Sequence, residues 1–422
     1  MKQTIPGRAP AEASASTRFF VPVGLGTSET AANNATVLTI AGVLRTLTMV
    51  RSTNPGSGIT ETVTVSLGGS TIATLVFTDG DLTQSAAGPF ACADFAALFF
   101  QKVVTGGTPT VGVYTWAFEW EGTNAGEAWC TGAGIGPSTS VQNYANPYGT
   151  ATVNATRENV EGVIPLTCTV TRLGVRALTS PGGTGTFETS VYKSGTKQDG
   201  GGGTPDTRAT INAADIFTLS DVALGVSAGD RIAFSSIPTG TPSAATRLVF
   251  AFAYTPSVDG ESFLSGVVNA NWAGATRYLP PTGSNAQLAT EADNALTVHA
   301  GTAFLLRSLF GAFTAAAGAS PRARTLTLYL NGSSTSVTAG IAGTSQVDCS
   351  DLVNSQAVTV GNTFSVEQTV TSTPTTARGS IALVQFIAPE VPPAALFQST
   401  YPARIGRPWR AVPSGFRPPG IQ

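Results

Sequence analysis

The stretch VSAGDRIAFSSIPTGTP, residues 226–242, has two relatives elsewhere in this chain of 422 residues. They are FACADFAALFFQKVVTGGTP at 90–109 and VTVGNTFSVEQTVTSTP at 358–374. The copies share a polar turn residue and a closing Thr-Pro pair, at Asp94, Asp230 and Asn362 and at Pro109, Pro242 and Pro374. The three prolines are separated by 133 and 132 residues. Such regular spacing indicates an internal repeat, which decides the architecture.

Other landmarks recur in the same order around this stretch. An aromatic-proline-glycine opening appears as FFVPVG (19–24), YANPYG (144–149) and YLPPTG (278–283). Extended segments follow as TVTVSLGG (62–69), FETSVYKSG (187–195) and TLTLYLNG (325–332), and apolar strands close each copy. We therefore predict three units in series, at residues 17–122, 142–256 and 276–388.

The junctions between the units also repeat. GEAWCTG begins at Gly126 and GESFLSG at Gly260, so we expect residues 123–141 and 257–275 to be equivalent joints. Trp129 and Phe263 are candidates for buried aromatics that fix the angle between units. Residues 1–16 are interpreted as an N-terminal extension. The expected arrangement is a stiff rod of units stacked end to end.

The fold class follows from the periodicity within the units. In TVTVSLGG and TLTLYLNG apolar residues alternate with Thr, Ser or Tyr, which is the period-two pattern of a strand with one buried face. Short strands separated by Gly, Pro and Asn turns indicate a sandwich or a barrel. We predict an all-β protein of three tandem jelly-roll-like β-sandwich domains, since the long middle connection fits a jelly roll better than an immunoglobulin sandwich.

Composition limits the classes of partner. Charged residues make up only 11% of the chain and the net charge is -2, so no basic field is available to hold nucleic acid. A neutral surface favours association with other proteins, and we expect a homo-oligomer. The N-terminus lacks the apolar core of a secretion signal, and no run of eighteen apolar residues predicts a membrane helix.

Few residues of the chain could bind a metal ion or a cofactor, and we predict no cofactor. The chain has one histidine, His299, which we interpret as structural, and four scattered cysteines expected to be buried free thiols: Cys92, Cys130, Cys168 and Cys349. Asp79 and Asp81 supply too few oxygen ligands to define a calcium site, although calcium stays open.

A glycosidase needs only two carboxylates, so the glutamates are candidates for a hydrolytic pair. Glu119 and Glu121 flank Trp120, whereas Glu127 and Glu261 lie in the repeated joints and more plausibly serve them. We predict that the protein is not an enzyme. Asp230 and Asn362 are expected to bind nearby backbone N–H groups and stabilise turns.

Residues 389–422 differ from the rest of the chain in being rich in proline and arginine. Proline would hold this segment extended at about 3 Å per residue. One interpretation is a disordered tail, and the other is an arm that binds a neighbouring subunit through aromatic and arginine anchors. The anchor residues would be Tyr401, Arg404, Arg407, Trp409, Arg410, Phe416 and Arg417.

With these features the chain resembles virion proteins of tailed bacteriophages that are built of tandem jelly-roll modules. The resemblance covers most of residues 17–388 and is carried by the FFVPVG-like opening, the turns at Asp230 and Asn362, and the closing Thr-Pro hairpin. It implies an exterior component of the virion, either a capsid decoration or head fibre protein or a tail, collar or baseplate fibre. It also implies contacts with other virion proteins, commonly as a trimer, and assembly in the host cytoplasm.

Two other classes of function are consistent with the sequence. A glycan-binding adhesin, used for host attachment, would stack sugar rings on aromatics such as Trp272. A polysaccharide hydrolase is the least favoured class, and it would depend on Glu119 and Glu121.

Overall fold

The computed structural model describes residues 1–389 except 26–27, 125, 133, 147, 149–152, 269–270, 273, 282–288, 291–294 and 300. Strands dominate this part of the chain, with one four-residue α-helix, α1 (Ala32–Ala35), and two 3-10 turns, η1 (Arg157–Asn159) and η2 (Gly201–Gly203). The prediction of an all-β protein is therefore confirmed. Residues 1–389 form one compact unit, and the predicted arm from 390 onward lies outside the described residues.

The strands form six sheets that pack in three pairs, and we call each packed pair a sandwich. In the first sandwich one sheet has the order β10-β6-β12-β1-β3, with β9 also pairing β6, and the other has the order β4-β2-β11-β7-β8, with β5 also pairing β11. The strands are β1 (Lys2–Glu12), β2 (Arg18–Phe20), β3 (Gly24–Leu25), β4 (Ser28–Glu29), β5 (Val37–Leu38), β6 (Gly42–Arg51), β7 (Thr60–Leu67), β8 (Ser70–Phe77), β9 (Thr83–Ala86), β10 (Phe90–Cys92), β11 (Ala97–Thr105) and β12 (Gly112–Gly122).

In the second sandwich the sheets have the orders β13-β23-β17-β21 and β15-β14-β22-β18-β19, with β16 also pairing β22 and β20 pairing β18. The strands are β13 (Ala128–Thr131), β14 (Asn143–Ala145), β15 (Val153–Asn154), β16 (Gly162–Val163), β17 (Cys168–Ala177), β18 (Thr186–Lys193), β19 (Thr196–Lys197), β20 (Ala209–Ile211), β21 (Ile216–Val226), β22 (Arg231–Thr239) and β23 (Leu248–Pro256).

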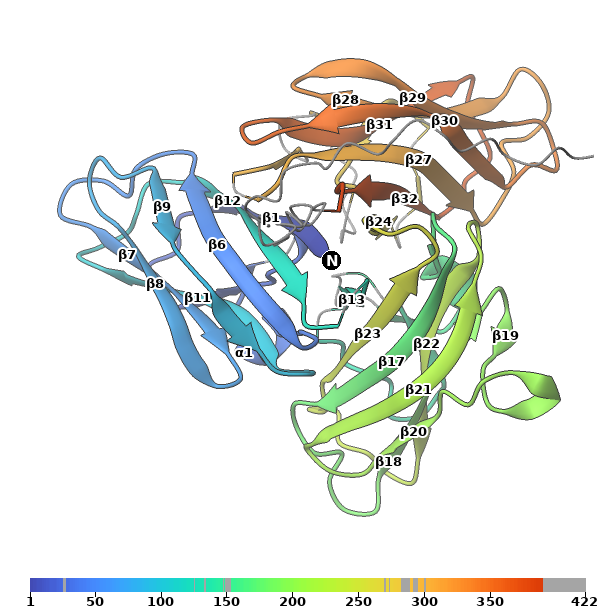
Figure 1. The fold of residues 1–422 in the computed structure, drawn as a ribbon, viewed down its shortest axis with the longest axis horizontal. Coiled ribbons are helices and arrows are strands. Elements are labelled where there is room, and N and C mark those ends of the chain that lie inside the picture. The colour runs from blue at the N-terminus through green and yellow to red at the C-terminus, as the bar shows by residue number, and fades with distance from the viewer. Residues whose placement is uncertain are drawn as a thin grey trace, which may run out of the picture. The chain divides into compact units, whose positions relative to one another are not determined.

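The third sandwich has sheets of order β24-β32-β27-β30 and β25-β31-β28-β29, with β26 also pairing β31. Its strands are β24 (Glu261–Val268), β25 (Arg277–Leu279), β26 (Leu296–Thr297), β27 (Phe304–Phe313), β28 (Ala323–Leu330), β29 (Ser333–Ala342), β30 (Asp348–Val358), β31 (Thr363–Thr371) and β32 (Gly379–Phe386). In Figure 1 the three sandwiches run from blue through green to orange and red.

The period-two segments of the sequence are strands whose inner residues build the cores. In β7 the side chains of Val63, Val65 and Leu67 are buried between more exposed Thr and Ser residues, as the alternation predicts. In the third sandwich the turn after β28 holds Asn331 and Gly332 at φ 50° and 75°. Positive φ at both residues is the geometry that an Asn-Gly hairpin turn requires.

Strands also occupy the segments expected to be an extension and joints. Strand β1, within residues 1–16, pairs with β12 from Lys2↔Glu121 to Ala9↔Tyr114. Strand β13 in the first joint pairs with β23, and β24 in the second joint pairs with β32. All three strands add to the sheet that contains the closing strand of the sandwich they join. The closing strands thereby become interior strands of their sheets.

Candidate assembly interfaces

The first and second sandwiches share an apolar interface. On β23, Phe250 and Phe252 belong to the core of the second sandwich, whereas Val249 and Ala251 on the opposite face belong to the core of the first. Strand β5 contacts β23 here, and the backbone N–H of Leu38 donates to Thr131 Oγ1 at 3.1 Å. A strand that feeds two cores must be apolar on both faces.

The aromatics expected at the joints lie in these interfaces. Trp129 on β13 packs into the core of the first sandwich, where its ring meets Trp120 edge to face at 6.0 Å between centroids. Phe263 on β24 packs into the core of the second sandwich and meets Tyr148 at 5.5 Å. The backbone of each aromatic thus belongs to a sheet of one sandwich, while its side chain packs in the core of the sandwich before it in the sequence.

The second and third sandwiches meet through β16. This strand contacts β24, β27 and β32, and the backbone N–H of Val163 donates to Ser380 Oγ at 3.2 Å. An ion pair between Arg231 and Asp348 also links the two sandwiches. The position of β16 beside β22 matches that of β5 beside β11, so the two interfaces use corresponding strands.

The third sandwich contacts the first in the same way, through β26. Strand β26 contacts β1 and β12, and Thr115 Oγ1 lies 2.6 Å from His299 Nε2. The three interfaces therefore form a closed cycle, in which each sandwich contacts both others. The expected rod is wrong, because an end-to-end stack leaves the first and third units without contact, and repeated head-to-tail interfaces close into a cycle when their rotations permit it.

Buried glutamine side chains cross between the sandwiches. The amide of Gln3 donates to the Trp129 carbonyl at 3.1 Å and accepts from the Trp129 N–H at 3.3 Å. The amide of Gln385 likewise binds the backbone N–H and C=O of Thr4, both at 3.0 Å. These bonds satisfy backbone groups on β13 and β1. Side chains of β1, β13 and β24 also line a cavity of about 40 Å³, which is room for only a few water molecules.

The carboxylates tested for hydrolysis all have partners within the protein. Glu127 pairs with Arg172 at 2.6 Å, and Glu261 pairs with Arg307. Each joint glutamate therefore binds an arginine of the sandwich that follows the joint, on β17 in the second sandwich and on β27 in the third. Glu119 accepts from the Thr302 N–H at 3.1 Å. On the same strand, Glu121 pairs with Arg45. Glu119, Glu127 and Glu261 are buried at these contacts, whereas the Glu121–Arg45 pair is partly exposed.

The repeated turn residues bind backbone as expected. Asp230 accepts from the Ser227 N–H at 2.8 Å, and Asn362 accepts from the Thr359 N–H at 2.9 Å. Asp94 accepts from the Ala41 N–H at 2.8 Å and also pairs with Arg172 of the second sandwich. The three Thr-Pro prolines are buried in the connections that precede the closing strands, at Pro109, Pro242 and Pro374.

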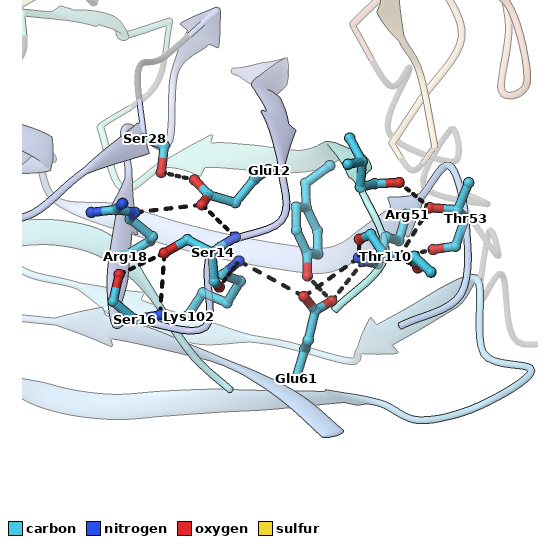
Figure 2. A network of polar contacts seen from close by, with 12 residues as sticks. Glu12, Ser14, Ser16, Arg18, Ser28, Arg51, Thr53, Glu61, Lys102 and Thr110 are labelled. Carbon is cyan, nitrogen blue, oxygen red and sulfur yellow. Dashed lines mark hydrogen bonds and ion pairs between the residues drawn. The ribbon is translucent and has the colours of Figure 1, made fainter. Parts of the chain in front are cut away.

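A charged network missed in the sequence lies inside the first sandwich (Figure 2). Glu61 Oε2 is 2.6 Å from Arg51 Nε, and Glu61 Oε1 is 3.7 Å from Lys102 Nζ, with all three side chains fully buried. The hydroxyl of Tyr114 donates to Glu61. Arg51 and Tyr114 lie on one sheet while Glu61 and Lys102 lie on the other, so the network holds the sheets together.

The ends of the network continue into loops. Arg51 donates to the carbonyls of Thr53 and Thr110, and Lys102 donates to the carbonyl of Ser14 at 3.3 Å. Burial lowers the pKa of Lys102, an effect that the charge of Glu61 opposes. The charged groups of the cluster are thus enclosed and paired, and they join the two sheets of the first sandwich.

His299 lies in the interface between the third and first sandwiches. Burial lowers its pKa to about 4 from a reference value of 6.5, because the charged imidazolium is poorly solvated there. Well above pH 6.5 the folded and unfolded states are both neutral at this residue, and no stability is lost. As the pH falls from 6.5 toward 4, the unfolded chain takes up the proton first, so the folded state loses stability.

We expect this loss to reach about 1–2 kcal/mol at pH 4.5, allowing for partial contact with solvent. Urea unfolding of the wild type and of His299→Gln at pH 7.5 and 4.5 measures it. The glutamine amide can bind Thr115 but does not titrate, whereas the carboxylates titrate in both proteins. If the two proteins lose stability equally on acidification, His299 does not contribute as stated.

The remaining candidate residues are the tryptophan considered for sugar binding, the cysteines and the candidate calcium ligands. Trp272, considered for sugar stacking, is 2% exposed and packs on Phe313, so that expectation is wrong. None of the four cysteines, all of which lie in the described part of the chain, forms a disulfide; Cys130 is partly exposed and the others are buried. Asp81 accepts from the Thr78 N–H at 2.9 Å. The described residues contain no group of three or more His, Cys, Asp or Glu that could hold a metal ion.

A groove of about 520 Å³ lies between the second and third sandwiches, with Asp230, Phe310, Gln346 and Asp348 in its wall. Three of its polar side chains have protein partners: Ser227 for Asp230, Arg231 for Asp348, and backbone carbonyls for the Gln346 amide.

No protein-family model matches the chain, and no curated protein sequence matches it. Among the described residues no helix has the length and apolar character needed to cross a membrane. The predicted arm residues, from Tyr401 to Arg417, lie outside the described residues, as do Pro147, Gly149 and Gly283 of the repeated openings.

Proposed function

We propose that the chain is three tandem jelly-roll-like domains that serve as a non-enzymatic exterior part of a tailed-phage virion. The observation that carries this proposal is the closed cycle of interfaces, in which β5, β16 and β26 each pack on the next sandwich. Apolar side chains and buried amides fill these contacts. Three sandwiches joined in this way resist movement relative to one another. Such rigidity suits a structural component of an assembly better than an enzyme that must open to admit a substrate.

The proposed partners are other virion proteins and further copies of the chain, with a homotrimer favoured. Each cyclic interface is already filled within one chain, so copies would associate through the outer sheet faces or through residues 389–422. Mass spectrometry of purified virions with copy counting tests the proposal. Copy numbers in the hundreds support capsid decoration, a small multiple of the tail symmetry supports a tail, collar or baseplate part, and absence from the virion refutes both.

Deletion of residues 390–422 is expected to leave the β-sandwiches folded and to abolish incorporation into the virion. The physical reason is that Pro-rich chain supplies no core, whereas its aromatic and arginine residues are typical interface anchors. Circular dichroism and thermal unfolding check the fold, and immunoblotting of purified particles checks incorporation. As a matched variant, Trp409→Ala should weaken incorporation without a change in melting temperature. Normal incorporation of the deleted protein would contradict the role of the arm.

A glycan-binding adhesin is the second candidate, and the groove at Asp348 favours it because its volume would admit a saccharide unit. A glycan array tests this function, and specific hits that Asp348→Ala removes would support it. Hydrolysis is tested separately, as release of reducing sugar from host polysaccharide that Glu119→Gln abolishes. Such release would replace the structural proposal with an enzymatic one.

A further inference from the structure

The interface between the third and first sandwiches, which we call the seam, differs from the other two in its connection. The chain passes from β12 to β13 through residues 123–127, and from β23 to β24 through residues 257–260. These short tethers keep the partner surfaces of the first two interfaces at high effective concentration. The seam joins the two ends of the described chain, and only non-covalent contacts close it.

Specific polar contacts align the seam. Arg8 Nη1 donates to the Ala295 carbonyl at 3.2 Å, and the Thr302 N–H donates to Glu119 at 3.1 Å. Gly301, at φ 102°, approaches Thr4 so closely that a Cβ there would lie 2.8 Å from Thr4 Oγ1. The seam therefore has a defined register, as the tethered interfaces do, and neither surface is a general apolar patch.

The only histidine of the chain lies at this seam. The strands packed against it carry six charged groups: Lys2, Arg8 and Glu12 on β1, Glu119 and Glu121 on β12, and Glu367 on β31. Glu119 is bound to Thr302 and lies 3.7 Å from Lys2, and Arg8 is bound to Ala295. The other three are bound within their own sandwich, Glu12 to Arg18, Glu121 to Arg45 and Glu367 to Tyr278. Burial is the cause of the low pKa of His299. Protonation of the neutral imidazole would place a poorly solvated positive charge in the seam. Separation of the two surfaces would let water solvate this charge.

We propose that the seam opens in acid and that its two surfaces then accept a second copy of this chain. Opening uncovers the β26 side of the third sandwich and the β1–β12 side of the first. These surfaces fit each other and lie at opposite ends of one chain, so a second copy offers the complement of both. Head-to-tail interfaces that fail to close within one molecule continue into the next. The partner is identified by this complementarity and does not depend on the proposed virion role.

Two variants, each of which adds one cysteine to the four native ones, test the exchange directly. A Cβ at residue 301 would lie 3.5 Å from the Cβ of Thr4, which is within the range for a disulfide. Thr4→Cys and Gly301→Cys proteins are mixed at high concentration, held at pH 4.5, returned to pH 7.5 under mild oxidation and separated on a non-reducing gel. We expect at least about tenfold more disulfide-linked heterodimer than in a mixture kept at pH 7.5. Neither variant alone can form this bond.

Three further variants assign the effect to the seam. His299→Gln in both partners should hold the heterodimer at its neutral-pH amount. Glu119→Ala should raise it at pH 7.5, whereas Asn34→Ala, which removes a 3.0 Å bond to Arg247 at a tethered interface, should not. Because a side chain at Gly301 is strained, light scattering of the wild type after the same acid step gives a second readout. No increase in mass together with no acid-dependent heterodimer would overturn the proposal.

Discussion

Glu61→Ala is expected to destabilise the first sandwich by roughly 3–5 kcal/mol, because it strands two buried cations. The carboxylate lies between Arg51 Nε at 2.6 Å and Lys102 Nζ at 3.7 Å, and the three side chains are 0% exposed. Without it, Lys102 must lose its proton or draw in water, and the Tyr114 hydroxyl loses its acceptor. Chemical unfolding followed by tryptophan fluorescence measures the change.

The matched control is Glu188→Ala. Glu188 also pairs with a lysine, Lys197 at 2.7 Å, but the glutamate is 36% exposed. An exposed pair of this kind contributes about 0–1 kcal/mol, so the two glutamate deletions should differ severalfold in effect. Equal losses would show that burial does not set the importance of the Glu61 network.

The period-two alternation of apolar residues in β7 also predicts that Glu61 of this network is buried. Glu61 stands two residues before Val63 in a period-two strand, and therefore on the buried face of β7. Arg324 stands at the corresponding place before Leu326, and it too is buried, with Nη1 2.9 Å from Gln368 Oε1. Charged residues in phase with the apolar alternation lie on the same buried face as the apolar ones. Their partners, Arg51 on the opposite sheet for Glu61 and Gln368 on the neighbouring strand for Arg324, are distant in the sequence, and the local pattern does not describe them.

The contact between the third and first sandwiches illustrates what a repeat leaves undetermined. Equivalent joints predict equivalent interfaces, and Trp129 and Phe263 do occupy corresponding places. Whether repeated interfaces give an open stack or a closed cycle depends on the rotation at each joint, which side-chain packing sets. Strand β1 was missed for a related reason. Its sequence KQTIPG lacks the glutamate and the aromatic of GEAWCTG, and only its pairing with β12 reveals the common role.

Trp129→Ala is expected to cost about 3–5 kcal/mol, which is the usual effect of removing a buried tryptophan. The ring is 3% exposed, its backbone pairs with β23 of the second sandwich, and its side chain fills the core of the first. The cavity should therefore open at an interface and weaken the coupling between two sandwiches. In calorimetry the unfolding transition should shift to lower temperature and broaden or split, since domains that lose their interface unfold separately.

Trp272→Ala is the control that separates an interface from a core. Trp272 is 2% exposed and packs on Phe313 within the third sandwich, at 5.0 Å between ring centroids. Its removal should destabilise to a similar extent while the other two sandwiches keep their shared transition. The ratio of van't Hoff to calorimetric enthalpy should thus fall further for Trp129→Ala than for Trp272→Ala. Equal ratios would mean that Trp129 acts only as another core residue, and that the sandwiches are coupled elsewhere.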